Sequence, residues 1–403
     1  MTRKCLNRGS RQLLVAALLF IWWSAGSVLA QTTSETPQKR REVRRTFSLT
    51  KFYDTPTPLP AGEPGQLIRS EDFEEYDLAD GVNAVRILYH SRSATGQDVA
   101  ASGVVLFPDG KPPTGGWPVI AWAHGLNGVA RQCAPSLARN VEHGPFLSMY
   151  VNLGYAVVAT DYTGLGTNFR NAYADMQSNA RDVIYSLPAA RAAVPALGSR
   201  WVAIGTAEGG MAVVGLAELE NEFRDSSYLG SVALSGLIDL QDIYAHAGTV
   251  SGSLPLLLAY GIKTVYPQFD AKEILTGKAF PLFERIGQGC SESQAAPEIP
   301  ASELLKPNWQ GNKLVGQYFS RNTAGQTPAY RPLLVISGDA DAEATATKKI
   351  VTRLCRQGDQ VQWEQYSDPD PGRVIGDSVG DQMAWIQARF ADGPVPSNCS
   401  ARR

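Results

Sequence analysis

Apolar and polar positions follow a regular pattern from about Ala84 onward. Short apolar runs of strand length alternate with longer segments of helical periodicity. Strands are predicted at residues 85–90, 100–107, 117–123, 156–160, 201–204, 229–234, 333–337 and 361–366. Helices are predicted at 140–153, 173–193, 211–219, 344–356 and 374–390. The first two strands form a hairpin, and the later alternation predicts an α/β fold whose mostly parallel sheet is covered by helices on both faces.

Two segments depart from this pattern. Residues 238–327 break the alternation and are predicted to form a mostly helical insertion, which divides the core into residues 66–237 and 328–403. Residues 31–65 are polar and rich in proline, and they carry a basic run at 39–45. We interpret residues 31–65 as a tail or a wrapped arm. A basic run is usually solvated, and binding to a membrane surface is the alternative.

The first thirty residues have the pattern of a targeting segment. Residues 13–23 form an apolar run, small residues lead to Ala30, and the opening is basic, with Arg3, Lys4, Arg8 and Arg11. This pattern predicts a secretory signal peptide at 1–30 that is cleaved after Ala30. An uncleaved anchor is the alternative, because the run is near the lower length limit for a membrane span. We therefore expect a secreted or periplasmic protein without a later span.

Composition narrows the class of protein. The chain has 403 residues, of which 44% are hydrophobic, and a net charge of −2. Removal of the four cations of the signal peptide takes this charge to −6. The apolar fraction excludes a disordered chain, and the acidic balance argues against a nucleic-acid partner.

Four cysteines follow the signal peptide, and an even number in an exported protein predicts two disulfides in one of three pairings. These cysteines are Cys133, Cys290, Cys355 and Cys399. The alternative is that they are buried free thiols.

Residues 201–211 carry the most informative motif. A short apolar strand enters a turn in which Gly205 and Gly209 flank Ala207, and a helix follows. This is the backbone pattern of the nucleophile elbow, G-x-S-x-G, in which the central residue is exposed at the edge of the sheet. Here that residue is Ala207, whose methyl group cannot attack a carbonyl.

Three further segments belong to the same architecture. The loop at 121–128 contains His124-Gly125 and would lend the backbone N–H of Leu126 to an oxyanion hole, together with that of Glu208. Asp341 is an acid at the end of a strand. A histidine is expected after the last strand, but residues 366–374 contain none, and the last histidine of the chain is His246. Pro371, or a neighbour of it, stands where this histidine is expected.

These segments together resemble the secretory lipase family typified by fungal lipase A. The resemblance is carried by residues 123–136, 161–166, the turn around Gly205, 260–267 and 338–341. It implies an α/β-hydrolase fold with an inserted helical cap, and hydrolysis of carboxylic esters, often acylglycerols, by a Ser-Asp-His triad. It also implies that Cys133 pairs with Cys290 and Cys355 with Cys399. The chain departs from the family at Ala207 and Pro371, and only Asp341 of the triad is retained.

The two replacements argue against hydrolysis by the family mechanism on energetic grounds. In a serine protease, loss of the nucleophile or of the histidine lowers the turnover number about 10⁶-fold. The rate that remains is about 10³–10⁴ times the rate of the uncatalysed reaction in water. The first hypothesis is thus an inactive pseudo-lipase that binds a lipid, acyl or ester-like ligand, or a protein partner. The second is an active ester hydrolase with replacement residues, and the third is a structural or interaction protein with a closed cleft.

Several residues bear on the second and third hypotheses. Catalysis by replacement residues would use the hydroxyl of Thr206 or a set of carboxylates, namely Glu208, Asp341, Asp368 and Asp370. In the alternative, non-catalytic interpretation, Glu208 is a solvated acid at the start of a helix. His124 is predicted to be a structural loop residue. The apolar run 254–259 either lines an acyl pocket or packs in the core. No cofactor and no metal site are predicted, because no group of ligands has suitable spacing.

Overall fold

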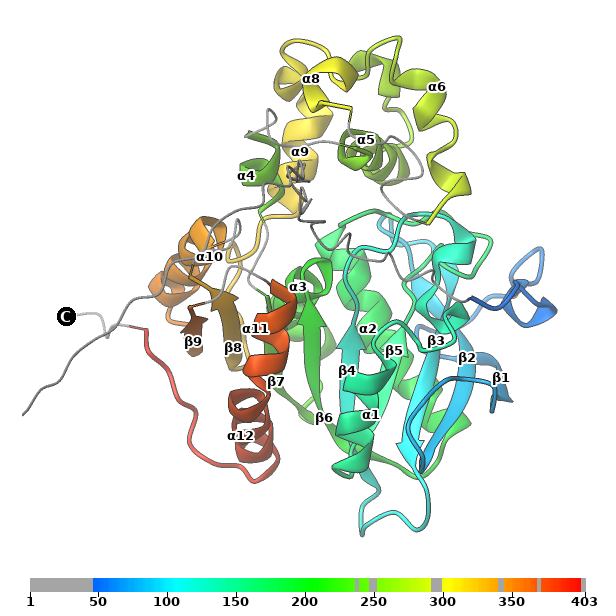
Figure 1. Cartoon of the computed structure of the whole chain (residues 1–403), viewed down its shortest axis with the longest axis vertical. Helices are drawn as coiled ribbons and strands as arrows, with labels where there is room; N and C mark the ends of the chain where they lie inside the picture. Colours follow the sequence, from blue (N-terminus) through cyan, green and yellow to red (C-terminus); the bar gives the residue numbers. More distant parts are fainter. Residues whose placement is uncertain are drawn as a thin grey trace, which may run out of the picture. The chain divides into compact units, whose positions relative to one another are not determined.

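The structure, a computed structural model, describes residues 46–235, 239–245, 252–290, 299–339, 344–367 and 371–399 (Figure 1). Several residues singled out above lie outside these ranges. They are the predicted signal peptide, the basic run, His246, Asp341, Asp368 and Asp370.

A nine-stranded sheet forms the centre, in the order β1-β2-β3-β5-β4-β6-β7-β8-β9. The strands from β5 to β9 in this order are parallel to one another, and β1, β2 and β3 join them through antiparallel pairs. The mostly parallel sheet is therefore confirmed. The strands are β1 (Leu67–Asp72), β2 (Val82–Arg92), β3 (Asp98–Pro108), β4 (Trp117–Ala123), β5 (Ala156–Thr160), β6 (Leu197–Thr206), β7 (Tyr228–Leu234), β8 (Leu333–Gly338) and β9 (Val361–Tyr366).

Helices cover both faces of this sheet (Figure 1). One face packs against α2 (Met176–Ala193), α3 (Glu208–Phe223) and α10 (Ala344–Gln357). The other packs against α1 (Gly144–Asn152), α11 (Pro371–Asp377) and α12 (Val379–Phe390). Side chains on successive positions of a strand point to opposite faces, so both clusters draw on the same strands. In β4, Ala121 belongs to the first cluster and Trp122 to the second.

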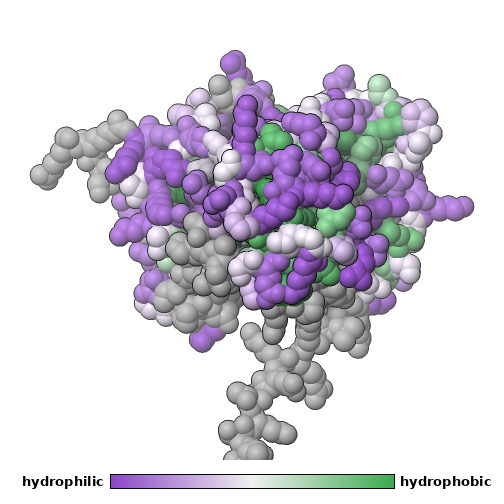
Figure 2. Space-filling view, turned by 90° about the horizontal axis from the view of Figure 1, so that it is seen from above, coloured by the Kyte–Doolittle hydropathy of each residue, from purple (hydrophilic) through white to green (hydrophobic). Residues whose placement is uncertain are grey.

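The helical insertion is also confirmed, and it forms a cap between β7 and β8. Its α-helices among the described residues are α4 (Leu240–Ala245), α5 (Leu254–Val265), α6 (Phe280–Phe283), α8 (Ala301–Leu304) and α9 (Lys313–Arg321). These helices share an apolar cluster of their own, separate from the two clusters of the sheet. The cap lies over one end of the sheet (Figure 1). Seen from that side, the described surface is mostly hydrophilic, with apolar side chains in scattered patches (Figure 2).

Short 3₁₀ turns complete the described chain: Lys51–Tyr53, Arg131–Cys133, Pro135–Leu137, Ala271–Glu273, Ile286–Gln288 and Trp309–Gly311.

Two elements differ from the prediction. Strand β1 was missed because its residues are mostly polar and lie at the edge of the sheet. The helix predicted at 374–390 is two helices, α11 and α12, which are separated at Ser378. The side chain of Gln382 lies in this break and donates to the Ile375 carbonyl and the Ser378 hydroxyl. A hydrophobic period continues across such a break, so the pattern alone does not reveal it.

The described part of the N-terminal arm packs onto the core through Arg86, which is 1% exposed. The guanidinium carbon of Arg86 lies 3.3 Å from the ring centroid of Phe73, and the rings of Phe47, Tyr53 and Tyr76 surround it. The Nε atom of Arg86 donates to the Tyr76 hydroxyl at 2.7 Å. Cation–π contacts of this kind are strongest for a desolvated cation. The arm therefore contributes two of the four rings that enclose a buried charge.

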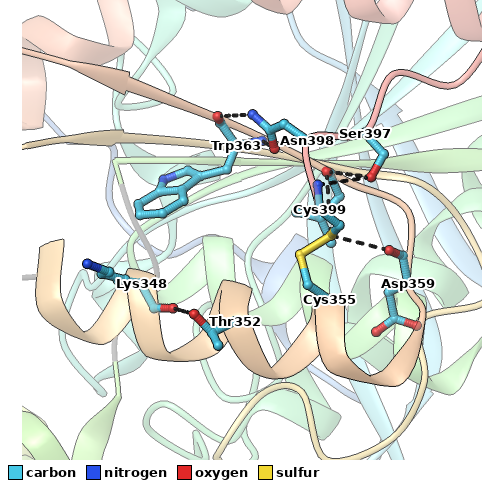
Figure 3. Close-up of a disulfide and its surroundings, with 9 residues drawn as sticks. Lys348, Thr352, Cys355, Asp359, Trp363, Ser397, Asn398 and Cys399 are labelled. Carbon is cyan, nitrogen blue, oxygen red and sulfur yellow. Dashed lines mark hydrogen bonds between the residues drawn. A yellow bond between two sulfur atoms is a disulfide. The ribbon is translucent and has the colours of Figure 1, made fainter. Parts of the chain in front are cut away.

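Both disulfide pairings implied by the family resemblance are confirmed. Cys133 is bonded to Cys290, with 5.0 Å between their Cα atoms, and Cys355 to Cys399, with 5.3 Å. The second disulfide fixes the C-terminal segment beside β9 (Figure 3). There the amide of Asn398 donates to Val361 O at 3.1 Å, and its side chain bonds both N and O of Trp363. The segment thus satisfies backbone groups of an edge strand, which would otherwise be open to pairing with another chain.

We predict that a Cys355→Ala/Cys399→Ala variant loses about 2–4 kcal/mol of unfolding free energy, because the closed loop no longer restricts the unfolded chain. Amide exchange in β9 should also rise, since the segment that covers this strand is released. Urea unfolding and hydrogen–deuterium exchange measure the two effects. A Cys133→Ala/Cys290→Ala variant is the control and should leave β9 protected. Unchanged protection of β9 in the first variant would contradict the assigned role of the disulfide.

Candidate functional site

Ala207 lies at the apex of a sharp turn between β6 and α3. Its backbone has φ 49° and ψ −112°, a conformation that is strained for a residue with a side chain. A Cβ atom on Gly205 would overlap the carbonyl oxygen of Gly209, and one on Gly209 would overlap that of Ala123. Glycine is therefore required at both positions by close backbone contacts. Ala207 at the apex is partly exposed.

The loop after β4 lies against this apex. A Cβ atom on Gly125 would be 3.7 Å from the Cβ of Ala207. The side chain of the preceding His124 is buried, with Nδ1 2.6 Å from Gly125 O and Nε2 3.1 Å from Asp161 O. Its ring packs on Tyr162, with 4.2 Å between the centroids, and the Tyr162 hydroxyl donates to His124 O. Both ring nitrogens face backbone carbonyls, which is the arrangement of a structural histidine.

The same loop is fastened to the cap. Gly128 has φ 104°, and a Cβ atom there would lie 3.1 Å from Cys133 Sγ and 3.3 Å from the Cα of Cys290. The Cys133–Cys290 disulfide therefore packs directly against the loop. Leu126, the predicted donor of an oxyanion-hole N–H, packs against the apolar cluster of the cap. The position of the loop thus depends on core and cap together.

Glu208 follows the apex and begins α3, but the interpretation of its side chain as a solvated acid was wrong. The residue is only 7% exposed. Its Oε1 atom accepts hydrogen bonds from Ala174 N at 2.9 Å and from Asn179 Nδ2 at 2.8 Å. Burial raises the pKa of this carboxyl, and the two hydrogen bonds oppose that rise. The side chain ties α3 to the segment before α2, while its backbone stays at the apex.

The loops that would carry the acid and the histidine meet at the ends of β8 and β9. Ser367 Oγ donates to Asp339 Oδ2 at 3.0 Å, and Asp339 N donates to Tyr366 O. Asp341 lies outside the described residues. Pro371 begins α11, and its side chain is not among those described. The structure therefore brings the two loops together but does not place the predicted triad positions themselves.

Sequence reasoning missed two buried carboxylates beneath the site. Asp161 accepts from Ser136 N at 2.8 Å and from the hydroxyls of Ser136 and Ser102. Asp182 accepts from Thr163 N at 2.7 Å and from the Thr163 hydroxyl. Burial raises both pKa values, that of Asp182 to about 6. Asp161 belongs to the motif at 161–166, but nothing in that motif shows which distant serines bond it.

Two general searches cover the described residues only. Among these, no three His, Cys, Asp or Glu side chains are arranged to hold a metal ion. No helix within the same ranges is both long and apolar enough to cross a membrane. The other described histidines lie in structural contacts: His90 Nδ1 is 3.1 Å from Asp98 Oδ1, and the ring of His143 packs on Trp122.

Solved structures with this arrangement include lipases and esterases. Lipase A of Candida antarctica in its closed state matches with a TM-score of 0.74 and 16% identity, over 88% of this chain and 89% of that one. A rice cell wall degrading esterase, LipA of Xanthomonas oryzae, matches with a TM-score of 0.69 and 17% identity, over 82% and 99%. The chain has the α/β-hydrolase fold.

These similarities concern the fold alone, because the identities are low. No protein-family model matches the chain, and no curated relative matches it significantly. The α/β-hydrolase fold places a nucleophile at the turn after the strand that corresponds to β6. In this chain that turn carries Ala207.

We predict that Gly209→Ala destabilises the protein by about 2 kcal/mol or more, because the new methyl group would overlap Ala123 O. Gly277→Ala is the matched control, since a Cβ atom there meets nothing within 4 Å, and its effect should stay within about 0.5 kcal/mol. Chemical unfolding measures both values. Equal effects of the two substitutions would show that the close contact at the elbow does not constrain the fold.

Proposed function

We propose that this protein is a non-hydrolytic member of the α/β-hydrolase fold that binds an acyl or ester-like ligand around Ala207. The observation that carries the proposal is a complete elbow without a nucleophile. The strained backbone at the apex, the close contacts of Gly205 and Gly209 and the adjoining loop are all present, but the apex side chain is a methyl group. Strain of about 1–3 kcal/mol is retained at such positions only where the surroundings impose it.

The ligand class follows from the chemistry of the site. In an α/β-hydrolase fold the oxyanion hole is formed by backbone N–H groups of the residue after the apex and of the loop that adjoins it, which by position are Glu208 and Leu126 in this chain. A carbonyl or carboxylate oxygen is the group that such donors bind. Solved structures of the same fold include a lipase and an esterase, which supports a carboxylic ester or fatty acid as the ligand. Ala207 at the apex is partly exposed, which supports access of a ligand head group to this position.

Replacement chemistry finds little support among the described residues. Glu208 is engaged in two hydrogen bonds on its Oε1 atom, and Thr206 is 5% exposed on the strand side of the apex.

The run 254–259 lies in α5, where Leu256 and Leu258 are fully buried in the cluster of the cap. Core packing therefore accounts for these leucines without an acyl chain. A cavity of about 10 Å³ beside Glu208 has room for one water at most.

Export remains part of the proposal. Two disulfides are typical of proteins that fold in an oxidising compartment, and the basic, apolar and small-residue pattern of residues 1–30 fits a cleaved signal peptide. We therefore propose a secreted or periplasmic protein.

The purified mature chain should hydrolyse short- and long-chain p-nitrophenyl esters no faster than an Ala207→Gly variant. Without a nucleophile and a general base, the site can supply at most about 10³–10⁴ over water. An Ala207→Ser/Pro371→His variant should exceed Ala207→Ser alone, since the hydroxyl needs a base.

Ester turnover by the unmodified chain would refute the inactive assignment if it persists through purification and falls in Thr206→Val or Glu208→Gln. Turnover that none of these variants changes would come from a contaminant.

Ligand binding predicts a second result. Saturating decanoate should raise the melting temperature by about 2 °C or more, because a ligand at 100 times its dissociation constant adds about 2.7 kcal/mol. Ala207→Leu should abolish this shift by filling the apex, whereas Ala207→Gly should keep it. The absence of a shift with every fatty acid and ester tested would favour the interaction protein with a closed cleft.

A further inference from the structure

The segment that returns the chain from the cap to the core, residues 322–332, is held by acidic side chains. Gly325 N donates to Glu218 Oε1 at 2.5 Å, and the Thr327 hydroxyl donates to Glu218 Oε2 at 3.4 Å. Ala329 N donates to Asp359 Oδ1 at 3.0 Å. Glu218 lies in α3, and Asp359 lies between α10 and β9. The two carboxyls thus fix this return segment from two different parts of the core.

Both carboxyls are buried in conditions that disfavour their charges. Glu218 is 8% exposed and Asp359 is 7% exposed. The Oδ2 atom of Asp359 is buried and has no hydrogen-bond partner within the part of the chain that the structure describes. Ionisation of a buried carboxyl without a partner is unfavourable in free energy, and a second carboxylate nearby makes it less favourable still. A neutral carboxyl avoids both penalties and still accepts the amide hydrogen bond.

The cations nearby are bound elsewhere. On α10, Arg353 donates to Ala324 O at 2.5 Å and so bonds the backbone of the return segment. On α9, Arg321 pairs with Asp175 of the core. Arg331, within the return segment, pairs with Glu220.

The remaining charged neighbour of Glu218 on α3 is Glu222, which pairs with Arg181 of α2. Among the described residues, neither Glu218 nor Asp359 therefore has an ion-pair partner of its own.

A polar pocket gives water access to this place. It measures about 490 Å³ and is bordered by Glu218 and Gln177 of the core, by Arg321 of the cap, and by Thr323, Gln326 and Thr327 of the return segment. Protons can reach Glu218 through it, and the return segment has space on that side in which to move.

We propose that Glu218 and Asp359 form a latch that holds the cap-return segment tightly when they are protonated and loosens it when both are ionised. The inference is independent of ester binding, because neither residue belongs to the site around Ala207. The latch acts on the segment through which the cap is joined to β8, so its state sets how firmly the cap is held at this connection.

The sign of the pH dependence follows from the direction of the shifts. Burial raises the pKa of Glu218 to about 7 and that of Asp359 to about 6, and Asp359 adds to the rise at Glu218. In the opened segment both acids return to their ordinary values of about 4. Protonation is therefore favoured in the closed state. The latch is fully effective below about pH 4 and is lost as the pH rises through 6 to 7.

Hydrogen–deuterium exchange of residues 322–332, corrected for intrinsic rates, tests this latch in the full mature chain. The opening constant of the segment should rise tenfold or more between pH 5 and pH 8, because the pKa shift of Glu218 exceeds one unit. A Glu218→Gln/Asp359→Asn variant mimics the protonated pair and should make this constant independent of pH. Amides of β6 serve as an internal reference that should not change.

Glu222→Gln is the matched control, since it removes a carboxylate from the same helix without touching the return segment; it should behave as the unmodified chain does. The single variants Glu218→Gln and Asp359→Asn should each remove part of the pH dependence of the opening constant. They provide the test if the double variant does not fold. A pH-independent opening constant in the unmodified chain would overturn the proposal, as would a pH dependence that persists in the neutral variants.

Discussion

The close approach of three backbone segments at the elbow is the constraint on which the site depends. The start of α3 touches the end of β4 through Gly209, and Gly205 of β6 touches Gly209 in turn. Side chains at either glycine would separate these segments and change the course of the chain at Ala207. The positive φ of Ala207 is a consequence of this packing. The backbone contacts of the two glycines therefore maintain the geometry of this turn without a contribution from the side chain of Ala207.

Buried carboxylates make the second layer of support. Asp161, which follows β5, holds the 3₁₀ turn Pro135–Leu137, and Asp182 holds the loop after β5. Glu208 ties the start of α3 to the segment before α2, and Glu218 and Asp359 hold the return from the cap. Each accepts backbone amide hydrogen bonds from a loop that has no strand or helix partner at that point. Because irregular backbone must satisfy its polar groups when buried, acidic side chains are well suited to this position. Acids in this protein thus serve mainly to hold loops.

Much of the fold could be predicted from the pattern of apolar residues, because central parallel strands are buried on both faces. The predicted strand at 361–366 matches β9, and residues 333–337 fall short of β8 by one residue. Two elements were not predicted correctly, each for a local reason. Strand β1 is a mostly polar edge strand. The helix predicted at 374–390 is divided at a break that the side chain of Gln382 fills, and the hydrophobic period continues across that break. The disulfides followed from the family resemblance, since cysteine spacing alone left three pairings open.

The sequence by itself determined that Ala207 stands between Gly205 and Gly209 and that no histidine follows His246, because these facts concern residue identity and order. Only the tertiary structure decided what the remaining candidates do. His124 has both ring nitrogens at backbone carbonyls, and Glu208 is buried against Asn179. Asp161 lies 37 residues from His124 in the chain, and Asn179 lies 29 residues from Glu208. Burial and hydrogen bonding are properties of the folded arrangement, and they separate a structural acid or histidine from a reactive one.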